Sequence, residues 1–256
     1  MRIGTKENNT WDYHFGENHK LEHSIAEKDI GVIIDASLTF DQHICEKIKK
    51  GNSLLGQICR TFIFKDKTMM LSLYKSLIRP QLEYGNQVWA PYLIRHICAL
   101  ENVQRRMTKV IPGFKDLSYE DRLRGLNLPT LAYRRLRGDM IELYKIVTGK
   151  YDQEITSDMI KFSNLHTRGN MYKIEKNRVR LKIRSNSFFI RTVNNWNSLP
   201  NHTVDAPSIR SFERRLDKHW TNHPIKYDHL ASTHPPRMPQ PQAHGIQELV
   251  TEADQA

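Results

Sequence analysis

Three groups of basic residues are the part of this sequence best suited to chemistry. The longest group lies between residues 173 and 184, where basic and apolar residues alternate, and it comprises Lys173, Lys176, Arg178, Arg180, Lys182 and Arg184. The other groups are Arg105, Arg106 and Lys109, and Arg134 and Arg135. Such side chains neutralise phosphates and release the counterions that surround a nucleic acid. The groups therefore predict a polynucleotide partner, although a solvated helix face with incidental charge also explains the two shorter ones.

Carboxylates are not gathered in a way that suits metal-dependent phosphoryl transfer. That reaction needs clustered acids, because two metal ions must hold the attacking and the leaving oxygen. The sequence contains no Asp-Asp pair, and Asp35, Asp41 and Glu83 belong to separate predicted elements, where strand-end, helix-capping and helix-surface roles explain them. His219 and His223 have the spacing of one helical turn, but they lack a third ligand nearby, so a solvated pair is expected. The sequence predicts no catalytic residue, no metal site and no cofactor in this chain.

The elements that must position the basic residues begin with short strands. Residues 13–15 and 20–23 flank a turn-forming stretch and predict a β-hairpin. Residues 30–34 are rich in β-branched side chains and predict a buried strand. Two or three strands are only marginally stable alone, so this β element must pack against helices or another partner.

Helical periodicity begins at Asp41 and dominates the rest of the chain. Helices are predicted from Asp41 to about residue 62, from Thr68 with a break or bend at Pro80 and another at Pro91, and over residues 92–111, 118–125, 130–149, 188–196 and 208–220. Residues 150–170 lack periodicity, and residues 171–184 predict a strand with one basic face. Trp89, Tyr92, Trp196 and Trp220 have core-like spacing and are predicted to pack inside.

This pattern predicts a mainly α fold with a small N-terminal β element, in the α+β class. Four parts are expected: a β-hairpin element over residues 1–37, a helical bundle over 38–150, a small basic domain over 151–220 and a disordered tail over 221–256. The tail is rich in Pro, His and Gln and too poor in apolar residues to offset the entropy cost of ordering.

The overall charge supports a polyanionic partner. The 256 residues carry 39 Lys and Arg against 28 Asp and Glu, a formal net charge of +11. Thirteen basic and four acidic residues lie between Lys161 and Trp220, so most of the excess falls in under a quarter of the chain. No apolar run is long enough to span a bilayer, and the first residues lack an apolar secretion segment. An intracellular protein is expected, with nothing to distinguish nucleus from cytoplasm.

A series of short motifs also resembles a known family. One stretch contains Arg79-Pro80, Leu82-Glu83-Tyr84-Gly85, Val88-Trp89 and Pro91-Tyr92, followed by Leu100-Glu101 and Val103-Gln104-Arg105-Arg106. These motifs resemble the segment downstream of the polymerase palm in the reverse transcriptases of jockey-like LINE (non-LTR) retrotransposons. Further likenesses follow the family's order at residues 28–35, 136–145, 167–169, 193–200 and 211–217.

The resemblance implies a role in holding nucleic acid. It implies a thumb-like helical bundle that closes on a template-primer duplex through backbone contacts, and a hairpin at Ile30, Gly31 and Val32 that is similar to the primer grip. The family's catalytic acids would lie upstream of Met1, and Mg²⁺ is expected only in an intact parent polymerase. The chain is thus expected to be a truncated RNA-directed DNA polymerase, inactive alone, with RNA and DNA as partners and no membrane.

Two other hypotheses remain open at this point. The chain would in one case be a helical protein-interaction or domesticated nucleic-acid-binding module, whose basic surface meets acidic partners. In the other it would be a translated relic without function, which folds poorly because its palm is missing. Neither the template nor the oligomeric state leaves a signal in the sequence.

Overall fold

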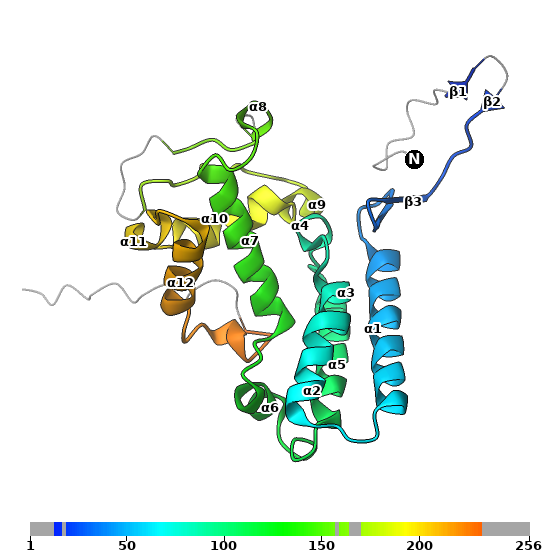
Figure 1. Cartoon of the computed structure of the whole chain (residues 1–256). Helices are drawn as coiled ribbons and strands as arrows, with labels where there is room; N and C mark the ends of the chain where they lie inside the picture. Colours follow the sequence, from blue (N-terminus) through cyan, green and yellow to red (C-terminus); the bar gives the residue numbers. More distant parts are fainter. Residues whose placement is uncertain (1–12, 17–18, 157–158, 164–169, 232–256) are drawn as a thin grey trace, which may run out of the picture.

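The computed structural model describes residues 13–16, 19–156, 159–163 and 170–231 (Figure 1). The described chain is mostly helical and has two small antiparallel hairpins at its N-terminal end, which confirms the predicted α+β class. Its interior consists of two hydrophobic clusters, which meet where residues 128–133 lead into helix α7. Within the described ranges, none of the helices combines the length and the apolarity that crossing a bilayer requires.

The two hairpins are formed by neighbouring strands. β1 (His14–Phe15) pairs with β2 (His19–Lys20), and β3 (Ala26–Asp29) pairs with β4 (Val32–Asp35). Ile30 and Gly31 connect β3 to β4, and both have positive φ angles, 42° and 79°, as a two-residue hairpin turn with the twist of the strands requires. The predicted strand over residues 30–34 is therefore wrong at its start, because its first two residues reverse the chain.

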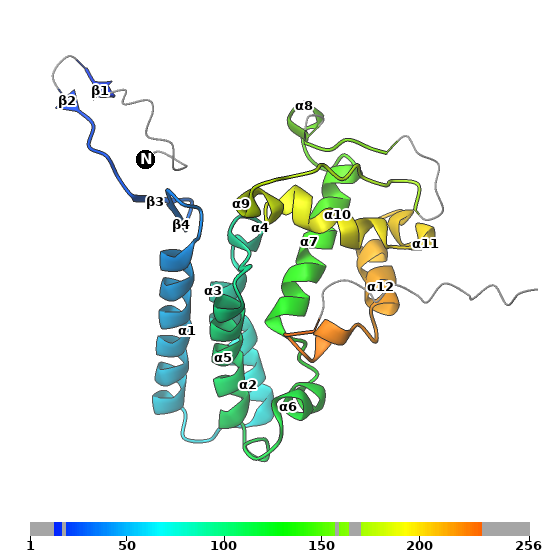
Figure 2. The same ribbon diagram turned by 180° about the vertical axis from the view of Figure 1, so that it is seen from behind.

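The first hydrophobic cluster lies among the helices that follow the hairpins. They are α1 (Asp41–Thr61), α2 (Lys67–Leu73), the π-helix η1 (Tyr74–Ile78), α3 (Arg79–Glu83), α4 (Asn86–Trp89), α5 (Ile94–Val110) and α6 (Tyr119–Leu126). Helices α1 and α5 run parallel and side by side (Figures 1 and 2). Near their N-termini Arg95 donates to Asp41 over 2.8 Å, and three turns later Arg106 donates to Asn52 over 3.3 Å.

Of the two outcomes predicted at Pro80, a break or a bend, the break does not occur. Helices α2, η1 and α3 follow one another without a gap, and Pro80 lies in the first turn of α3, where a residue without an N–H is tolerated. The wider π turn just before it accommodates the change in hydrogen bonding. The chain does leave the helix around Pro91, as predicted, and α5 begins at Ile94.

The second cluster is built by the C-terminal helices. They are α7 (Leu131–Val147), α8 (Gln153–Thr156), α9 (Lys182–Ser185), α10 (Phe188–Asn197), α11 (Asn201–Val204), α12 (Ile209–His219) and the 3-10 helix η2 (Pro224–Lys226). At its centre Tyr144 stacks on Phe212, with 4.3 Å between the ring centroids, and Trp196 is fully buried. Trp89 and Trp220 are buried too, which confirms the predicted packing role of these three tryptophans, whereas Tyr92, predicted to pack inside with them, is only partly buried.

The predicted basic strand over residues 171–184 is wrong. Ile174 forms one isolated bridge with Phe162, residues 175–180 have no regular structure, and residues 182–185 form the short helix α9. A strand needs a neighbour for its backbone groups. Residues 161–163 supply one only for residues 173–175, through two backbone hydrogen bonds of 2.8 Å, and residues 176–180 pair with no described strand. The alternation does not mark one buried face, because Ile174 is buried whereas Leu181 and Ile183, further along the same pattern, are exposed.

The start of the tail is ordered, against the prediction of disorder from residue 221. Ile225 is buried in the second cluster, and the Ile225 and Lys226 carbonyls accept hydrogen bonds from the hydroxyl and N–H of Thr130, the residue that caps α7. His223 packs against the Trp220 ring and its Nδ1 accepts from the Ile225 N–H, so it is not simply solvated. Residues 232–256, the rest of the predicted tail, lie outside the described residues.

Candidate nucleic-acid interface

Residues 176–184 form the most exposed run of positive charge in the described chain, here called the basic segment. Its five basic side chains are exposed, and no ion pair joins any of them to another described residue; they are Lys176, Arg178, Arg180, Lys182 and Arg184. Lys173, just before the segment, is only half-exposed and has an interaction of its own. The basic segment therefore offers its cations to a partner, in the form of an irregular chain that leads into α9.

Arg134 is engaged in an ion pair, and Arg135 is buried with both Nη atoms lacking a hydrogen-bond partner. Arg134 forms a two-pronged ion pair with Glu83, with Nη2 and Oε2 2.9 Å apart. Arg135 is only 6% exposed, and burial lowers the pKa of its guanidinium, although Glu101, Glu83 and Asp139 partly offset that effect. The interpretation of this pair as an outward basic face is wrong, because Glu83 of α3 pairs with Arg134 and because Arg135 is buried.

Other arginines of the C-terminal half are neutralised in the same way. Arg137 Nε lies 2.6 Å from Asp217 and links α7 to α12. Arg191 donates through Nε and Nη2 to Asp139, both over 3.0 Å, and its Nη1 reaches the Gln87 carbonyl of α4. These arginines therefore hold helices together and are not available to a polyanionic partner. Among the described residues, the basic segment is the main group of basic side chains without an ion pair.

The group on α5 is divided between interior and surface. Arg105 lies over the ring of Tyr119, 4.7 Å from its centroid, and its Nε is buried without a hydrogen-bond partner. Arg106 is exposed but donates to Asn52 on α1, and Lys109 is exposed in the last turn of the helix. Lys109, and Arg106 in part, are therefore available to a polyanion, whereas Arg105 is a packing residue.

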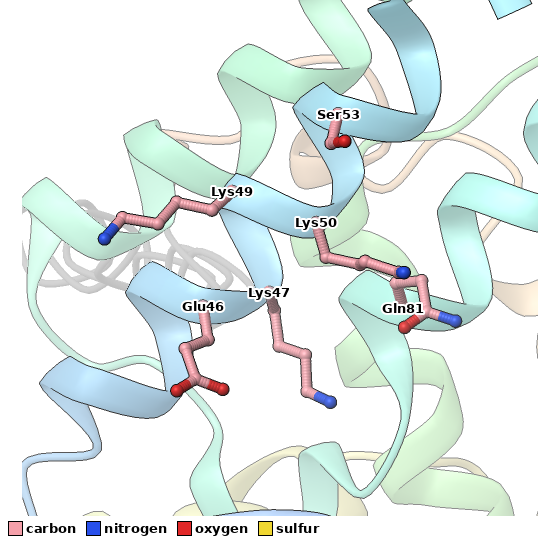
Figure 3. Close-up of a pocket in the computed structure, with 6 residues that line it drawn as sticks. All are labelled: Glu46, Lys47, Lys49, Lys50, Ser53 and Gln81. Carbon is pink, nitrogen blue, oxygen red and sulfur yellow. The ribbon is translucent and has the colours of Figure 1, made fainter. Parts of the chain in front are cut away.

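A further basic surface lies on α1, where the sequence interpretation placed none. Glu46, Lys47, Lys49, Lys50 and Ser53, with Gln81 of α3, line an open hollow of about 480 Å³, here called the α1 hollow (Figure 3). The ammonium groups of three lysines and one carboxylate give it a net positive charge. The signal was present in the sequence, since three lysines fall within residues 47–50, but their spacing also fits an ordinary solvated helix face.

The primer-grip-like residues are placed on the bundle by Tyr84. The Tyr84 hydroxyl donates to the Ile30 carbonyl over 3.0 Å, and its ring lies 3.3 Å from where a side chain on Gly31 would begin. Val32 is buried against Gly85, whereas Ile30 is 81% exposed at the tip of the turn. The hairpin tip is therefore held at the end of the bundle where α1 begins.

The basic groups do not form a single patch. Arg191 contacts the carbonyls of both Asn186, just after α9, and Gln87 of α4, so the end of the basic segment lies near α4 and hence near the hairpin tip. The α1 hollow lies in the first half of α1, which starts at that same end. Lys109 lies at the other end of α5, about 20 Å away along the helix.

The acids that could serve a metal ion have structural partners instead. The Asp35 carboxylate ends β4 and accepts hydrogen bonds from the hydroxyl and N–H groups of Ser37 and Thr39 and from the Phe40 N–H. Burial alone would raise its pKa, but these bonds hold the pKa below its usual value. Asp41 does not cap α1 as predicted, since it pairs with Arg95, and Glu83 pairs with Arg134. Among the described residues, no three His, Cys, Asp or Glu side chains are close enough together to hold a metal ion.

Comparison with known proteins indicates the origin of part of the chain. Over 126 residues it is 25% identical to an uncharacterised protein of Caenorhabditis elegans, a match that covers 48% of this chain and 64% of that protein. Over 95 residues it is 27% identical to the probable RNA-directed DNA polymerase from transposon X-element of Drosophila melanogaster, which covers 34% of this chain and 10% of that polymerase. The second likeness supports a reverse-transcriptase-related region.

These matches are partial. The chain spans less than two thirds of the length of either relative, and only a tenth of the transposon polymerase. No protein-family model matches the chain. No solved structure matches it either.

Proposed function

We propose that this chain binds an RNA–DNA template-primer duplex as a non-catalytic part of a LINE-type, jockey-like reverse transcriptase, with residues 38–150 in the role of its thumb. The observation that carries the proposal is the division of positive charge. Arg134, Arg137 and Arg191 form ion pairs with carboxylates within the fold, whereas the five bases of the basic segment are exposed and form no ion pair with another described residue. Mg²⁺ and the catalytic acids would belong to residues outside this chain.

The arrangement suits contact with phosphates rather than with base edges. An irregular, exposed segment can follow a sugar-phosphate backbone, and long flexible side chains at every second position contact successive phosphates. The basic segment ends near the hairpin tip, and the α1 hollow begins within two turns of the same end. A duplex that lies across this end would meet both surfaces, and the likeness to a transposon polymerase supports nucleic acid as the partner.

Affinity measured against salt tests the proposal. Wild type is expected to bind an RNA–DNA duplex with an affinity that falls steeply between about 50 and 200 mM salt. The triple variant Lys176→Ser, Arg178→Ser, Arg180→Ser should bind more weakly and lower the slope of log affinity against log salt by about 2 to 3, since each phosphate contact contributes about 0.9.

A control variant with the same change in net charge makes the test specific. Arg210, Arg214 and Lys218 are exposed on α12 and can be changed to serine together. This control should keep most of the wild-type slope. Equal losses in the two variants would show that only overall charge matters, and a wild-type affinity that does not respond to salt would refute nucleic-acid binding through these cations.

A further inference from the structure

The loop between α1 and α2 carries two large apolar side chains with almost no cover. Ile63 is 86% exposed and Phe64 is 87% exposed, the highest values among the large hydrophobic residues of the described chain. Single exposed apolar residues are common on protein surfaces, but two adjacent ones at a tip are not explained by packing. Figures 1 and 2 show this loop at the end of the bundle opposite the hairpins.

The loop is held firmly at both ends, so the exposure is built into the fold. On one side Phe62 packs against the first hydrophobic cluster, and its N–H donates to the Ile58 carbonyl over 3.0 Å. On the other side the Asp66 carboxylate caps α2, accepting from the N–H groups of Thr68 and Met69. Ile63 and Phe64 therefore project from a short segment with fixed ends.

Positive charge surrounds the apolar tip. Arg60 is exposed in the last turn of α1, and Lys65 and Lys67 follow the tip. Lys67 is anchored, since its Nζ donates to the Gly125 carbonyl over 3.0 Å and lies over the Phe114 ring. Asp66 is the one acid between Arg60 and Lys67, and its carboxylate is occupied by backbone N–H groups. Two exposed apolar side chains with cationic side chains beside them complement a partner that is negatively charged on its outside and has flat apolar groups in its interior.

We propose that Ile63 and Phe64 form a wedge that stacks on nucleobases where a bound duplex opens into single strands, while Arg60 and Lys65 contact the phosphates beside them. The inference rests on the proposed nucleic-acid binding and adds a second, base-contacting site to it. Aromatic and branched apolar side chains are the groups that proteins insert between base steps or stack on unpaired bases. Ten residues of helix separate Lys50 in the α1 hollow from Arg60, about 15 Å, a distance equal to about four or five base steps.

Fluorescence of 2-aminopurine at a junction tests the wedge directly. The probe is an RNA–DNA duplex with a single-stranded template overhang, in which 2-aminopurine occupies the first paired position of the DNA strand at the junction. Its fluorescence rises when it is unstacked. Wild type at saturating concentration should raise the fluorescence several-fold, and the double variant Ile63→Ser, Phe64→Ser should abolish the rise.

Two controls accompany this test. Because both side chains are exposed, the double variant should melt at the same temperature as wild type. Ile94→Ser, a change of another exposed apolar residue far from the tip, is the matched control and should keep the rise.

The outcomes separate this inference from the proposed function. If the double variant still binds the blunt duplex with wild-type salt dependence but loses the fluorescence change, and about fivefold to tenfold in affinity for the junction, the wedge is supported. If wild type binds the duplex without a fluorescence change, or the variant keeps the change, the wedge is refuted while duplex binding stands. If wild type binds no duplex, the proposed function fails as well. Binding of wild type, but not of the variant, to vesicles containing phosphatidylserine would overturn the inference in favour of a lipid surface.

Discussion

The fully buried carboxylate of Glu101 on α5 accepts a hydrogen bond from the backbone N–H of Leu131, 3.0 Å away, and so anchors the first turn of α7. Its other oxygen accepts from the Tyr119 hydroxyl over 2.5 Å and from Gln104 over 3.2 Å. Gln104 in turn accepts from the buried Tyr74 hydroxyl and donates to the Pro129 carbonyl. Two members of the motif that resembles the reverse transcriptases, Glu101 and Gln104, thus join the two hydrophobic clusters.

Replacement of Glu101 by Gln should destabilise the chain by about 3 kcal/mol, because it leaves the buried Arg135 without one of its compensating charges. Burial raises the pKa of Glu101, while the Tyr119 hydrogen bond and the Arg135 charge oppose that rise, so the ionised carboxylate depends on these neighbours. Urea unfolding measures the free energy. The double variant Glu101→Gln, Arg135→Met should recover part of the loss, since it removes the uncompensated charge as well; strictly additive effects of the two changes would contradict the coupling.

The His43 imidazole should make stability fall in mild acid. His43 is fully buried, its Nδ1 accepts from the Ile33 N–H over 3.1 Å, and its Nε2 has no partner. Burial, with the nearby charges of Lys47 and Lys28, lowers its pKa from 6.5 to about 4. Because the folded pKa lies below the unfolded one, the unfolded chain takes up the proton first. Stability is therefore lost as the pH falls from about 6.5 toward 4, by at most about 1.4 kcal/mol per pH unit.

The variant His43→Asn isolates this contribution, because an Asn carbonyl oxygen can accept the same hydrogen bond without titrating. Urea unfolding at several pH values between 7 and 4 gives the free energy of each protein. The difference between wild type and variant should shrink or reverse as the pH falls. If the free energies of unfolding of wild type and variant fall in parallel over this pH range, protonation of His43 does not destabilise the folded chain, and the prediction is wrong.

The sequence was sufficient for most of the helices and for the interior. Periodic apolar residues and caps such as Ser118 and Thr130 predicted α5, α6 and α7 within a few residues, and in the structure these two caps accept from N–H groups of the first turn. These features are local, so they can be read from one stretch of chain. The first hairpin is also predicted from the sequence, whereas the second is predicted only as a single strand over residues 30–34, because a β-branched residue such as Ile30 rarely adopts the positive φ that makes it part of a turn.

The candidate site was predictable only in part, because the fate of a charge depends on residues far along the chain. Arg134 and Glu83 are 51 positions apart, and Arg191 and Asp139 are 52 apart. Nothing near Arg134 in the sequence indicates that an acid on α3 will pair with it. Arg178, in contrast, is exposed and forms no ion pair with another described residue, although Glu175 lies only three positions before it in the sequence. The same limit explains the tail, since the order of residues 221–231 depends on Thr130.

The packing of α1 on α5, which sets the position of the α1 hollow, leads to a prediction about two glycines of the same helix. Gly51 is buried, and a methyl group added there would lie 3.2 Å from Val103 of α5 and 3.3 Å from Leu82 of α3. The nearest neighbour of such a group on Gly56 is the flexible end of Arg60, 3.8 Å away. In a helix interior, Gly→Ala alone is worth about 1 kcal/mol of added stability. Gly56→Ala should therefore stabilise the chain by about 0.5 to 1 kcal/mol.

At Gly51 the cost of overpacking, about 1 to 3 kcal/mol, should exceed that gain, so Gly51→Ala should destabilise the chain by about 1 kcal/mol. Thermal and urea unfolding of the two variants measure both changes, and a stabilising Gly51→Ala would show that α1 is not pressed against α3 and α5 as closely as the structure has it.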